Sequence, residues 1–374
     1  QGWGINPEAG GYRIFDAMGE LEPDFFLCSG DTVYADGPLQ PEVTLPDGRV
    51  WKNLVTPAKS KVAETLDEYR GVLAYNLLDE PLRRFNARVA QVNQWDDHEV
   101  HNNWWPGEIL SDVRYTERRA DVLAARGRQA FLEYLPVSDL SPDRAGRIYR
   151  KISHGPLVDV FVLDMRTYRD PNGANDYLDP ERGLLGQAQR DWLKRELQRS
   201  RATWKVIAND LPVGLGVEGP PGFFEAVAQG EDGVPLGREG EIGDLLRTAR
   251  RAGVQNIVFL TADVHNAYAL HNDPSRAAVG GFNAFWEFVA GPLSAGAFPP
   301  SAVQYDRTFG QEVRYAGNPP RTNTSPLEGF QYFGHVHVDG GSQVMTVSLR
   351  TADGETVFSQ AIEPVTRRRL GPWG

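Results

Sequence analysis

Short apolar segments, each followed directly by polar residues, recur along the first three quarters of the chain. They lie at residues 24–28, 87–95, 158–163, 204–208 and 257–260. Segments of this length that are rich in apolar and β-branched residues are typical of buried strands. Between them, apolar residues recur near helical spacing at residues 58–76, 113–134, 186–200 and 238–252. The alternation of strands and helices predicts an α/β fold with largely parallel strands.

The last quarter of the chain has a different pattern. Apolar segments at 343–349 and 356–362 flank the turn sequence ADGE at 352–355, which predicts a β-hairpin. We expect the region from about residue 330 to 365 to complete a second sheet, within one domain that covers residues 1–374. Segments rich in Gly and Pro predict long loops at residues 36–56, 170–185, 214–237 and 266–283. Loops of this length often carry function.

The composition is that of a globular enzyme and excludes several classes of protein. The net charge of −11 disfavours broad binding to nucleic-acid phosphates, which needs a basic surface. The single cysteine, Cys28, excludes a disulfide framework and cysteine-rich zinc sites. The sequence has no run of about 18 apolar residues of the kind that spans a membrane. Because the chain begins with Gln1 and shows no signal peptide, we expect a processed or trimmed form.

Side chains that can bind cations or phosphate follow the predicted strands. Parallel strands end at one edge of a sheet, and in α/β proteins sites form beyond that edge. We therefore expect the following residues to converge on one site: Asp31, Tyr34, Asp97, His98, Arg166, Asp210, Asp263 and His265.

The first two clusters have residue types that suit a metal site. The carboxylate of Asp31 can bridge two metal ions through its two oxygens, and the phenolate of Tyr34 suits a ferric ion. Asp96 and Asp97 repel one another unless a cation holds them. His98, beside them, can protonate a leaving group. The alternative interpretations are a simple strand-to-loop turn for the segment with Asp31 and Tyr34, and an acidic surface turn for the segment with Asp96 and Asp97.

The later clusters add further candidate groups. Asp263 and His265 are alternate residues of an extended segment, so their side chains point the same way. Asp210 is a candidate oxygen ligand, and Arg166 offers a planar, bidentate donor for a phosphate. The alternatives are that His265 is a buried core histidine, that Asp210 is a turn residue before Pro212, and that Arg166 forms a structural ion pair with a nearby acid.

Several segments together resemble a known family. They are SGDTVY at 29–34, WDDHEVHNNW at 95–104, LDMRTYR at 163–169, WKVIANDLP at 204–212 and LTADVH at 260–265. In this order they resemble the alkaline phosphatase D family of metal-dependent phosphatases and phosphodiesterases. The resemblance implies an α/β fold of the calcineurin-like type, a four-layer metallophosphatase sandwich in which two mixed β-sheets are flanked by helices.

The resemblance also implies a dinuclear or trinuclear cluster of Fe³⁺ and Ca²⁺. Its ligands, by position, are Asp31 as the bridging group, Tyr34 and His265 on the iron side, and Asp97, Asp210 and Asp263 for the other metal. His98 takes the place of the histidine that assists the leaving group, and Arg166 that of a phosphate-binding arginine. One departure is that the family usually supplies an iron ligand, often Cys, just before a Gln that matches Gln1. That ligand is either upstream or replaced, and Cys28 does not match it.

The expected activity is metal-dependent hydrolysis of phosphate mono- or diesters by a metal-activated water. Small-molecule phosphate esters are the expected substrates, with phospholipids as a further option. The alternative is a metal-binding protein with a decayed, non-hydrolytic site. We expect no stable nucleic-acid complex and no transmembrane segment. The resemblance implies a periplasmic or secreted location.

Overall fold

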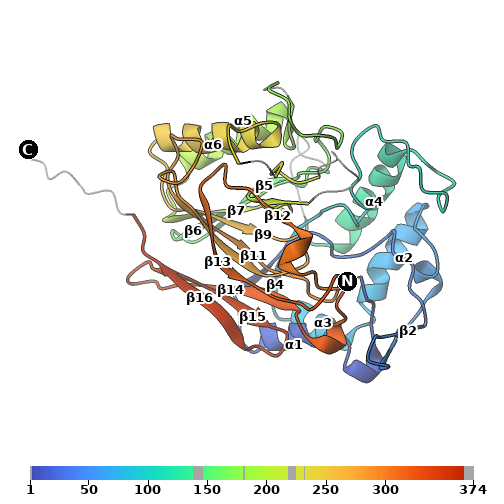
Figure 1. The fold of residues 1–374 in the computed structure, drawn as a ribbon. Helices are drawn as coiled ribbons and strands as arrows, with labels where there is room; N and C mark the ends of the chain where they lie inside the picture. The colour runs from blue at the N-terminus through green and yellow to red at the C-terminus, as the bar shows by residue number, and fades with distance from the viewer. Residues whose placement is uncertain (1, 138–145, 180–181, 218–224, 231, 366–374) are drawn as a thin grey trace, which may run out of the picture.

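A mixed sheet of seven strands forms the centre of the molecule (Figure 1). The computed structural model describes residues 2–137, 146–179, 182–217, 225–230 and 232–365. The strand order along the sheet is β13-β10-β11-β9-β7-β6-β5. These strands are β5 (Arg150–His154), β6 (Val158–Val162), β7 (Trp204–Ala208), β9 (Ile257–Thr261), β10 (Tyr268–Asn272), β11 (Phe285–Val289) and β13 (Gln311–Ala316).

The five predicted strands are all present, and the parallel arrangement is confirmed for them. β6, β7, β9 and β11 run parallel to one another in the large sheet. Every residue of β6 and β7 is buried, which explains why these segments are mostly apolar; Asp159 and Lys205 are the exceptions, and both are buried. β1 (Phe25–Ser29) and β4 (Ala90–Gln94) also pair in parallel, but they form a two-stranded sheet of their own.

The predicted hairpin is present as β15 (Met345–Thr351) and β16 (Thr356–Ile362), and β14 (Tyr332–Val338) extends it to three antiparallel strands. Strands also occur where the sequence predicts only loops: β2 (Glu42–Thr44), β3 (Val50–Lys52), β8 (Leu215–Gly216) and β10. That prediction is wrong there. β8 pairs with β12 (Gln304–Tyr305), and β10 pairs with β11 and β13. Such pairing with distant segments stabilises short strands that local composition does not predict.

The helices agree with prediction best at their carboxyl ends. They are α1 (Ile14–Gly19), α2 (Leu66–Asn76), α3 (Glu80–Asn86), α4 (Ala120–Tyr134), α5 (Gly186–Arg199) and α6 (Arg238–Arg251). α1 and α3 were not predicted. The predicted start of α2 at residue 58 is wrong, because Thr65 and Glu68 form a capping box that begins the helix at Leu66. α4 likewise begins at Ala120, seven residues later than residue 113.

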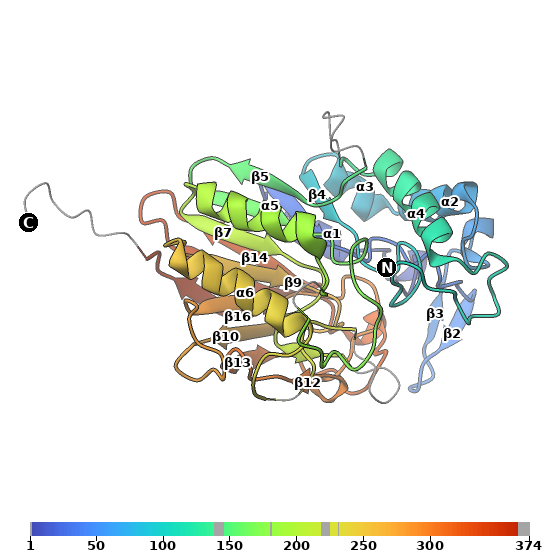
Figure 2. The same cartoon turned by 90° about the horizontal axis from the view of Figure 1, so that it is seen from above.

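The two faces of the seven-stranded sheet are covered by different elements. α5 and α6 pack on one face, as Figure 2 shows, and their Trp192 and Ile242 belong to the same buried cluster as Phe259 of β9. On the other face, Met345 and Val347 of β15 join a second buried cluster with residues of β6, β7 and β9. No helix among the described residues is long and apolar enough to cross a membrane. The polar side chains of the candidate site follow the carboxyl ends of these strands.

Candidate metal centre

The turns after β1 and β4 bring the first two clusters into contact. The two strands are parallel and in register, so Ser29 and Gln94 are partners at their carboxyl ends. Gly30 follows with φ of 93°, and a Cβ there would lie 2.3 Å from the Cβ of Asp96. Glycine is therefore required for the two turns to approach this closely.

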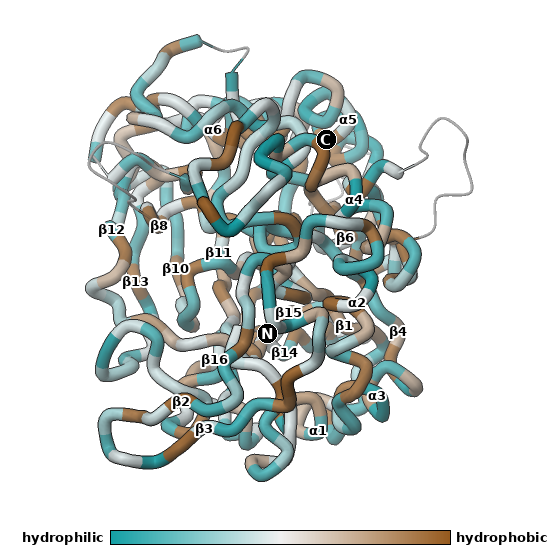
Figure 3. Tube along the Cα trace, turned by 90° about the vertical axis from the view of Figure 1, so that its right-hand side faces the viewer, coloured by the Kyte–Doolittle hydropathy of each residue, from teal (hydrophilic) through white to brown (hydrophobic). Residues whose placement is uncertain are grey.

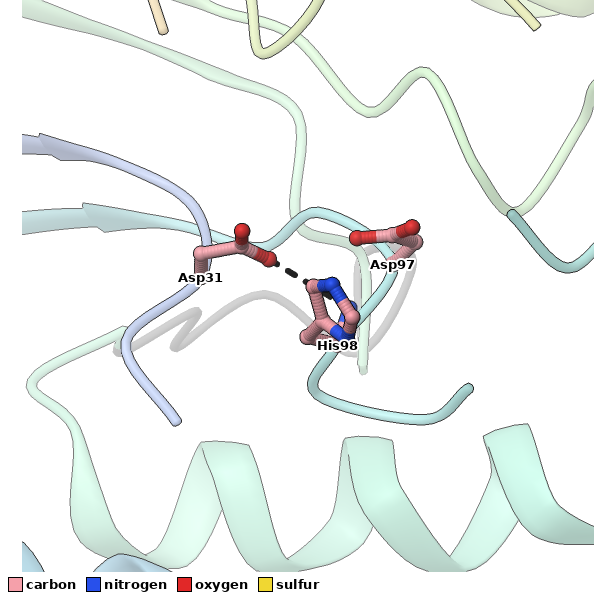
Figure 4. Close-up of side chains that lie close together, drawn as sticks. All are labelled: Asp31, Asp97 and His98. Carbon is pink, nitrogen blue, oxygen red and sulfur yellow. Dashed lines mark hydrogen bonds between the residues drawn. The ribbon is translucent and has the colours of Figure 1, made fainter. Parts of the chain in front are cut away.

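Three side chains from these turns form the centre of the candidate site (Figure 4). Asp31, Asp97 and His98 each offer one ligand atom, and these atoms all lie within 4.8 Å of one another. The backbone N–H of His98 donates to Oδ1 of Asp31 at 3.4 Å. Oδ2 of Asp97 accepts from the backbone N–H of Asn103 at 2.6 Å. Both carboxylates are thus held toward a shared space.

Tyr34 and His265 join this group, as the sequence predicts. The hydroxyl of Tyr34 donates to Oδ2 of Asp31 at 3.1 Å, and Nε2 of His265 lies 3.0 Å from the same hydroxyl oxygen. Nδ1 of His265 lies 2.6 Å from the carbonyl oxygen of Gly296, which can only accept a hydrogen bond. The proton of a neutral His265 is therefore on Nδ1, and the lone pair of Nε2 faces the Tyr34 hydroxyl, where it can bind a cation. Burial lowers the pKa of His265 to about 4, which keeps the ring neutral.

Arg166 connects the remaining predicted residues to the site. Its guanidinium is fully buried and donates through Nε to Oδ1 of Asp96 at 2.6 Å. It lies 3.5 Å from Oδ2 of Asp210 and 4.0 Å from Oδ1 of Asp263, and it also pairs with Glu225. The sequence left two interpretations open for Arg166, a phosphate-binding group and a structural ion pair, and the structure contains the ion pair.

The backbone is in an unusual conformation at three of the candidate ligands. Asp31, Asp263 and His265 have φ values of 51°, 65° and 53°. Residues other than glycine rarely adopt this left-handed region, and such strain concentrates at functional sites. The expectation that Asp263 and His265 lie on an extended segment is therefore wrong, because β9 ends at Thr261 and both residues are left-handed.

The site carries more buried negative charge than its cations balance. Burial is the main reason why the pKa values of Asp31 and Asp263 are well above their ordinary value, and neighbouring acids raise them further. Burial also raises the pKa of Asp210, to about 6. For Asp97, burial opposes ionisation, but the charges of His98 and Arg166 lower its pKa overall. A cation would relieve the repulsion among these carboxylates.

The donor set fits a metal ion. Oδ1 of Asp97 and Oδ1 of Asn209 are buried and accept no hydrogen bond within the described part of the chain. Buried oxygens without partners are unusual and point to an ion or water. Carboxylate, phenol and imidazole donors suit hard and borderline cations, including iron and calcium.

Three functional candidates were missed at the sequence level. Asp36, assigned to a loop, lies 2.7 Å from Nδ1 of His98 through its Oδ1. Glu99 accepts from the backbone N–H groups of Thr32 and Asp96, at 2.6 and 2.8 Å, and so joins the two turns. Glu225 lies in a segment predicted as a loop and pairs with Arg166. Glu99 directly follows His98 in the acidic cluster at 96–99, and Asp36 lies five residues after Asp31, so these two positions were usable signals, whereas Glu225 had none.

The protein is thus an α/β protein in which acidic side chains that follow the strands lie close together and form a candidate metal centre. The chain matches the PhoD-like phosphatase family over residues 1–349 and belongs to this family. This confirms the resemblance that the sequence motifs indicate.

Two individual proteins illustrate the relationship. The chain is 31% identical over 307 residues to alkaline phosphatase D of Bacillus subtilis (strain 168), in a match that covers 77% of this chain and 49% of the relative. It thus spans about half the length of that curated relative. A solved structure of PhoD has a similar fold, with a TM-score of 0.65 and 21% identity over 96% of this chain and 70% of the other.

Proposed function

We propose that the protein hydrolyses phosphate esters at a metal centre built on Asp31, Tyr34, Asp97, Asp210, Asp263 and His265. The observation that carries this proposal is the close group of Asp31, Asp97 and His98, within 4.8 Å, at the strand ends of a PhoD-like chain. Fe³⁺ and Ca²⁺ are the proposed metals, since the set contains both a phenol and several carboxylates. A cation held there would neutralise phosphoryl oxygens and lower the pKa of a bound water.

His98 is the proposed proton donor to the leaving oxygen. Burial opposes protonation of its ring, but Asp36, Asp97 and Asp31 outweigh burial and raise its pKa well above the ordinary value. The ring is therefore protonated at neutral pH. Its Nδ1 is engaged by Asp36, which leaves Nε2 as the donor. The ring of Tyr34 stacks on that of His98 with centroids 3.8 Å apart, and this contact limits the rotation of the imidazole.

Arg166 is the proposed organiser of the acids. Its guanidinium lies against Asp96, its Nε also lies 3.5 Å from Oδ2 of Asp210, and its Nη1 pairs with Glu225. In this arrangement it holds the turns after three strands in place. Contact between Arg166 and a substrate phosphate requires that some of these carboxylates turn to a cation instead.

Several broader features belong to the same proposal. We propose one domain over residues 1–374 with the four-layer calcineurin-like sandwich. The proposed substrates are small phosphate monoesters and diesters, with phospholipids as a further class. The proposed location is periplasmic or secreted. The acidic chain, with a net charge of −11, disfavours a stable complex with nucleic acid.

The deciding experiment replaces Asp31 by Asn. Hydrolysis of p-nitrophenyl phosphate and of bis-p-nitrophenyl phosphate should fall by at least about 10²-fold, because the shared carboxylate is lost. The matched control is Asp67→Asn, since the Asp67 side chain is 89% exposed on α2. Far-UV circular dichroism should be unchanged in both variants. Normal turnover in Asp31→Asn would refute the assignment.

Assays of the unmodified protein distinguish this function from a second candidate, that of a metal-binding protein with a decayed site. Elemental analysis would report iron and calcium in both cases. Metal-dependent melting without hydrolysis of either ester would favour the decayed site. Hydrolysis that chelator abolishes and metal restores would favour the phosphatase.

A further inference from the structure

The side chain of Asn172, in the segment after β6, joins three parts of the fold. Its amide nitrogen donates to the carbonyl oxygen of Asn103, in the turns that follow β4, at 2.9 Å. Its amide oxygen accepts from Nη2 of Arg169 at 2.5 Å and from Nη2 of Arg238, the first residue of α6, at 2.9 Å. Figure 3 shows β4 and α6 well apart in the molecule, so this side chain connects distant elements.

The partners of Asn172 require an amide at this position. A guanidinium group can only donate hydrogen bonds, and a carbonyl oxygen can only accept them. The two ends of the Asn172 amide therefore meet opposite demands, which fixes the orientation of its oxygen and nitrogen. Because Asn172 is buried, a side chain that meets only one demand loses a hydrogen bond that water cannot readily replace.

The oxygen end of the amide has a firm support. Arg169 and Arg238 are both buried, and each of them also donates to the carbonyl oxygen of Glu225. Arg238 is further held by the carbonyl oxygen of Ala226 at 3.2 Å. Two guanidinium groups that are themselves fixed thus hold the Asn172 oxygen, and the nitrogen is directed at Asn103.

Asn103 passes this contact on to the candidate metal centre. Its backbone N–H donates to Oδ2 of Asp97 at 2.6 Å. Its φ is 58°, a left-handed conformation that costs energy in residues other than glycine unless contacts hold it. Asn172 holds the carbonyl group of the residue whose N–H group holds Asp97. The bond from Asn172 therefore supports the orientation of the Asp97 carboxylate.

The orientation of Asp97 decides which of its oxygens can bind a cation. Oδ2 is engaged by the N–H of Asn103, whereas Oδ1 is buried and has no hydrogen-bond donor among the residues that the structure describes. The carboxylate thus presents one fixed ligand atom. Groups that orient a metal ligand in this way matter for binding, and their loss typically lowers metal affinity by about 10- to 100-fold.

We propose that Asn172 is a positioning residue for the metal ligand Asp97, on which it acts through the backbone of Asn103. The inference rests on the proposed function, because it concerns a ligand of the same metal centre. It adds that the cation affinity of the turn after β4 depends on the segment after β6 and on the start of α6. Neither dependence follows from the ligands themselves.

The test replaces Asn172 by Asp in the full chain. Aspartate keeps an oxygen toward the two guanidinium groups and adds a charge that attracts them, so the melting temperature should stay the same or rise. Its second oxygen repels the carbonyl of Asn103 instead of bonding to it. The affinity for Ca²⁺, measured by calorimetry, should therefore fall by about 10- to 100-fold. A merely structural role would move melting temperature and affinity in the same direction.

Asn175→Asp is the matched control. Asn175 is a buried amide in the same segment, which donates to the carbonyl of Val227 and accepts from the backbone N–H of Arg238, both at 2.9 Å. The substitution adds the same charge to the same segment but leaves the bond between Asn172 and Asn103 in place. The Ca²⁺ affinity of Asn175→Asp should match that of the unmodified chain, whatever its melting temperature.

A second variant and a second measurement keep the proposal testable if the aspartate disturbs folding. Asn172→Ala removes the bonds to Asn103 and to both guanidinium groups, so the melting temperature and the Ca²⁺ affinity should both fall. Hydrogen–deuterium exchange at the N–H of Asn103 reports the contact with Asp97 directly, without metal or substrate. This exchange should be faster in both Asn172 variants and unchanged in Asn175→Asp.

Two results would overturn the proposal. The first is that the Asn172 variants bind Ca²⁺ as tightly as the unmodified chain and protect the N–H of Asn103 equally well. The second is an equal loss of affinity in Asn172→Asp and Asn175→Asp, which would assign the effect to charge alone. If the unmodified chain binds no Ca²⁺, the proposed metal centre fails together with this inference, so the two failures are distinguishable.

Discussion

At the scale of single residues, the contact between Asp36 and His98 decides how a proton can be delivered. The carboxylate of Asp36 is buried and also accepts the backbone N–H of Asn102 at 2.9 Å, so it is fixed before it meets the ring. Burial opposes its ionisation, but the charge of His98 lowers its pKa overall. The two groups therefore hold each other in the charged form. Asp36 acts as a positioning residue for the proposed proton donor.

Substitution of Asp36 by Asn should affect esters unequally. Asn keeps a similar shape but removes the charge that keeps His98 protonated. Turnover of an alkyl phosphate, whose leaving oxygen needs a proton, should fall by up to about 10²-fold. Turnover of p-nitrophenyl phosphate, whose leaving group departs readily, should fall much less. Equal losses on both esters, together with a lower melting temperature, would assign Asp36 a structural role only.

His265 should make the metal-free protein sensitive to acid. Its folded pKa of about 4 lies below the ordinary 6.5, because burial disfavours the charged ring. Its contribution to stability is therefore complete above pH 6.5 and is lost as pH falls from 6.5 to about 4. At about 1.4 kcal/mol per pKa unit, the loss amounts to roughly 3 kcal/mol.

The measurement is urea unfolding in chelator at pH 7 and pH 5. His265→Asn removes the titrating ring, and Asn tolerates the positive φ of this position. The difference in unfolding free energy between the two pH values should be smaller in His265→Asn than in the unmodified chain. An identical difference would show that His265 takes up no extra proton on unfolding.

At the scale of elements, α2 shows how a local signal sets a boundary. Apolar spacing extends the prediction back to residue 58, yet the helix begins at Leu66. The hydroxyl of Thr65 accepts the N–H of Glu68 at 3.3 Å, and the Glu68 carboxylate accepts the N–H of Thr65 at 2.9 Å. These bonds satisfy N–H groups that the helix cannot pair internally. The S/T-x-x-E signature was present in the sequence, so this boundary was predictable.

Removal of this cap should destabilise the protein measurably. Thr65→Ala should lower the free energy of unfolding by about 1 kcal/mol, within the usual range of 0.5–2. Thr44→Ala, at an exposed position of β2, is the control and should change it by less than about 0.5 kcal/mol. Chemical denaturation of both variants tests this. Equal effects would mean that the capping box adds nothing to stability.

The strands show where prediction from sequence ends. β6, β7 and β9 were predictable because burial on both faces favours segments that are mostly apolar, such as IVFL in β9. β10 was not, although it is largely buried, because its sequence YALHN has no strong local preference and its stability comes from pairing with β11 and β13. The same limit applies to β8, which has two residues and pairs with β12.

At the scale of the whole molecule, the topology turns distant residues into one site. Asp31 and His265 are 234 positions apart, yet both bond to Tyr34, because the turn after β1 meets the turn after β9 although the two strands belong to different sheets. This convergence followed from the strand-and-helix pattern alone. The pairing of His98 with Asp36 and of Arg166 with Glu225 did not, since Asp36 and Glu225 lie in segments outside the helices and strands, whose course the pattern does not predict. Sequence thus predicted which strand ends meet, but not the contacts within the site.

The collective charge of the site couples cation binding to pH. In the metal-free protein, burial raises the pKa values of Asp31 and Asp263 above the ordinary 3.8, so the folded state holds protons that the unfolded state releases. These groups therefore favour the folded state less as pH rises through the raised values. A cation needs the ionised carboxylates and must displace those protons. Calcium should accordingly bind more tightly, and stabilise the fold more, at pH 8 than at pH 6.

Calorimetry in two buffers with different heats of ionisation measures the protons released when Ca²⁺ binds. The observed heat should differ between the buffers at pH 6, because protons pass from the site to the buffer. In Asp263→Asn one titrating group is removed, so fewer protons should be released, whereas Asp67→Asn should match the unmodified chain because its side chain is exposed on α2. Heat that is independent of the buffer would mean that calcium meets carboxylates which are already ionised. In that case, the repulsion among the buried acids would not be what drives calcium binding.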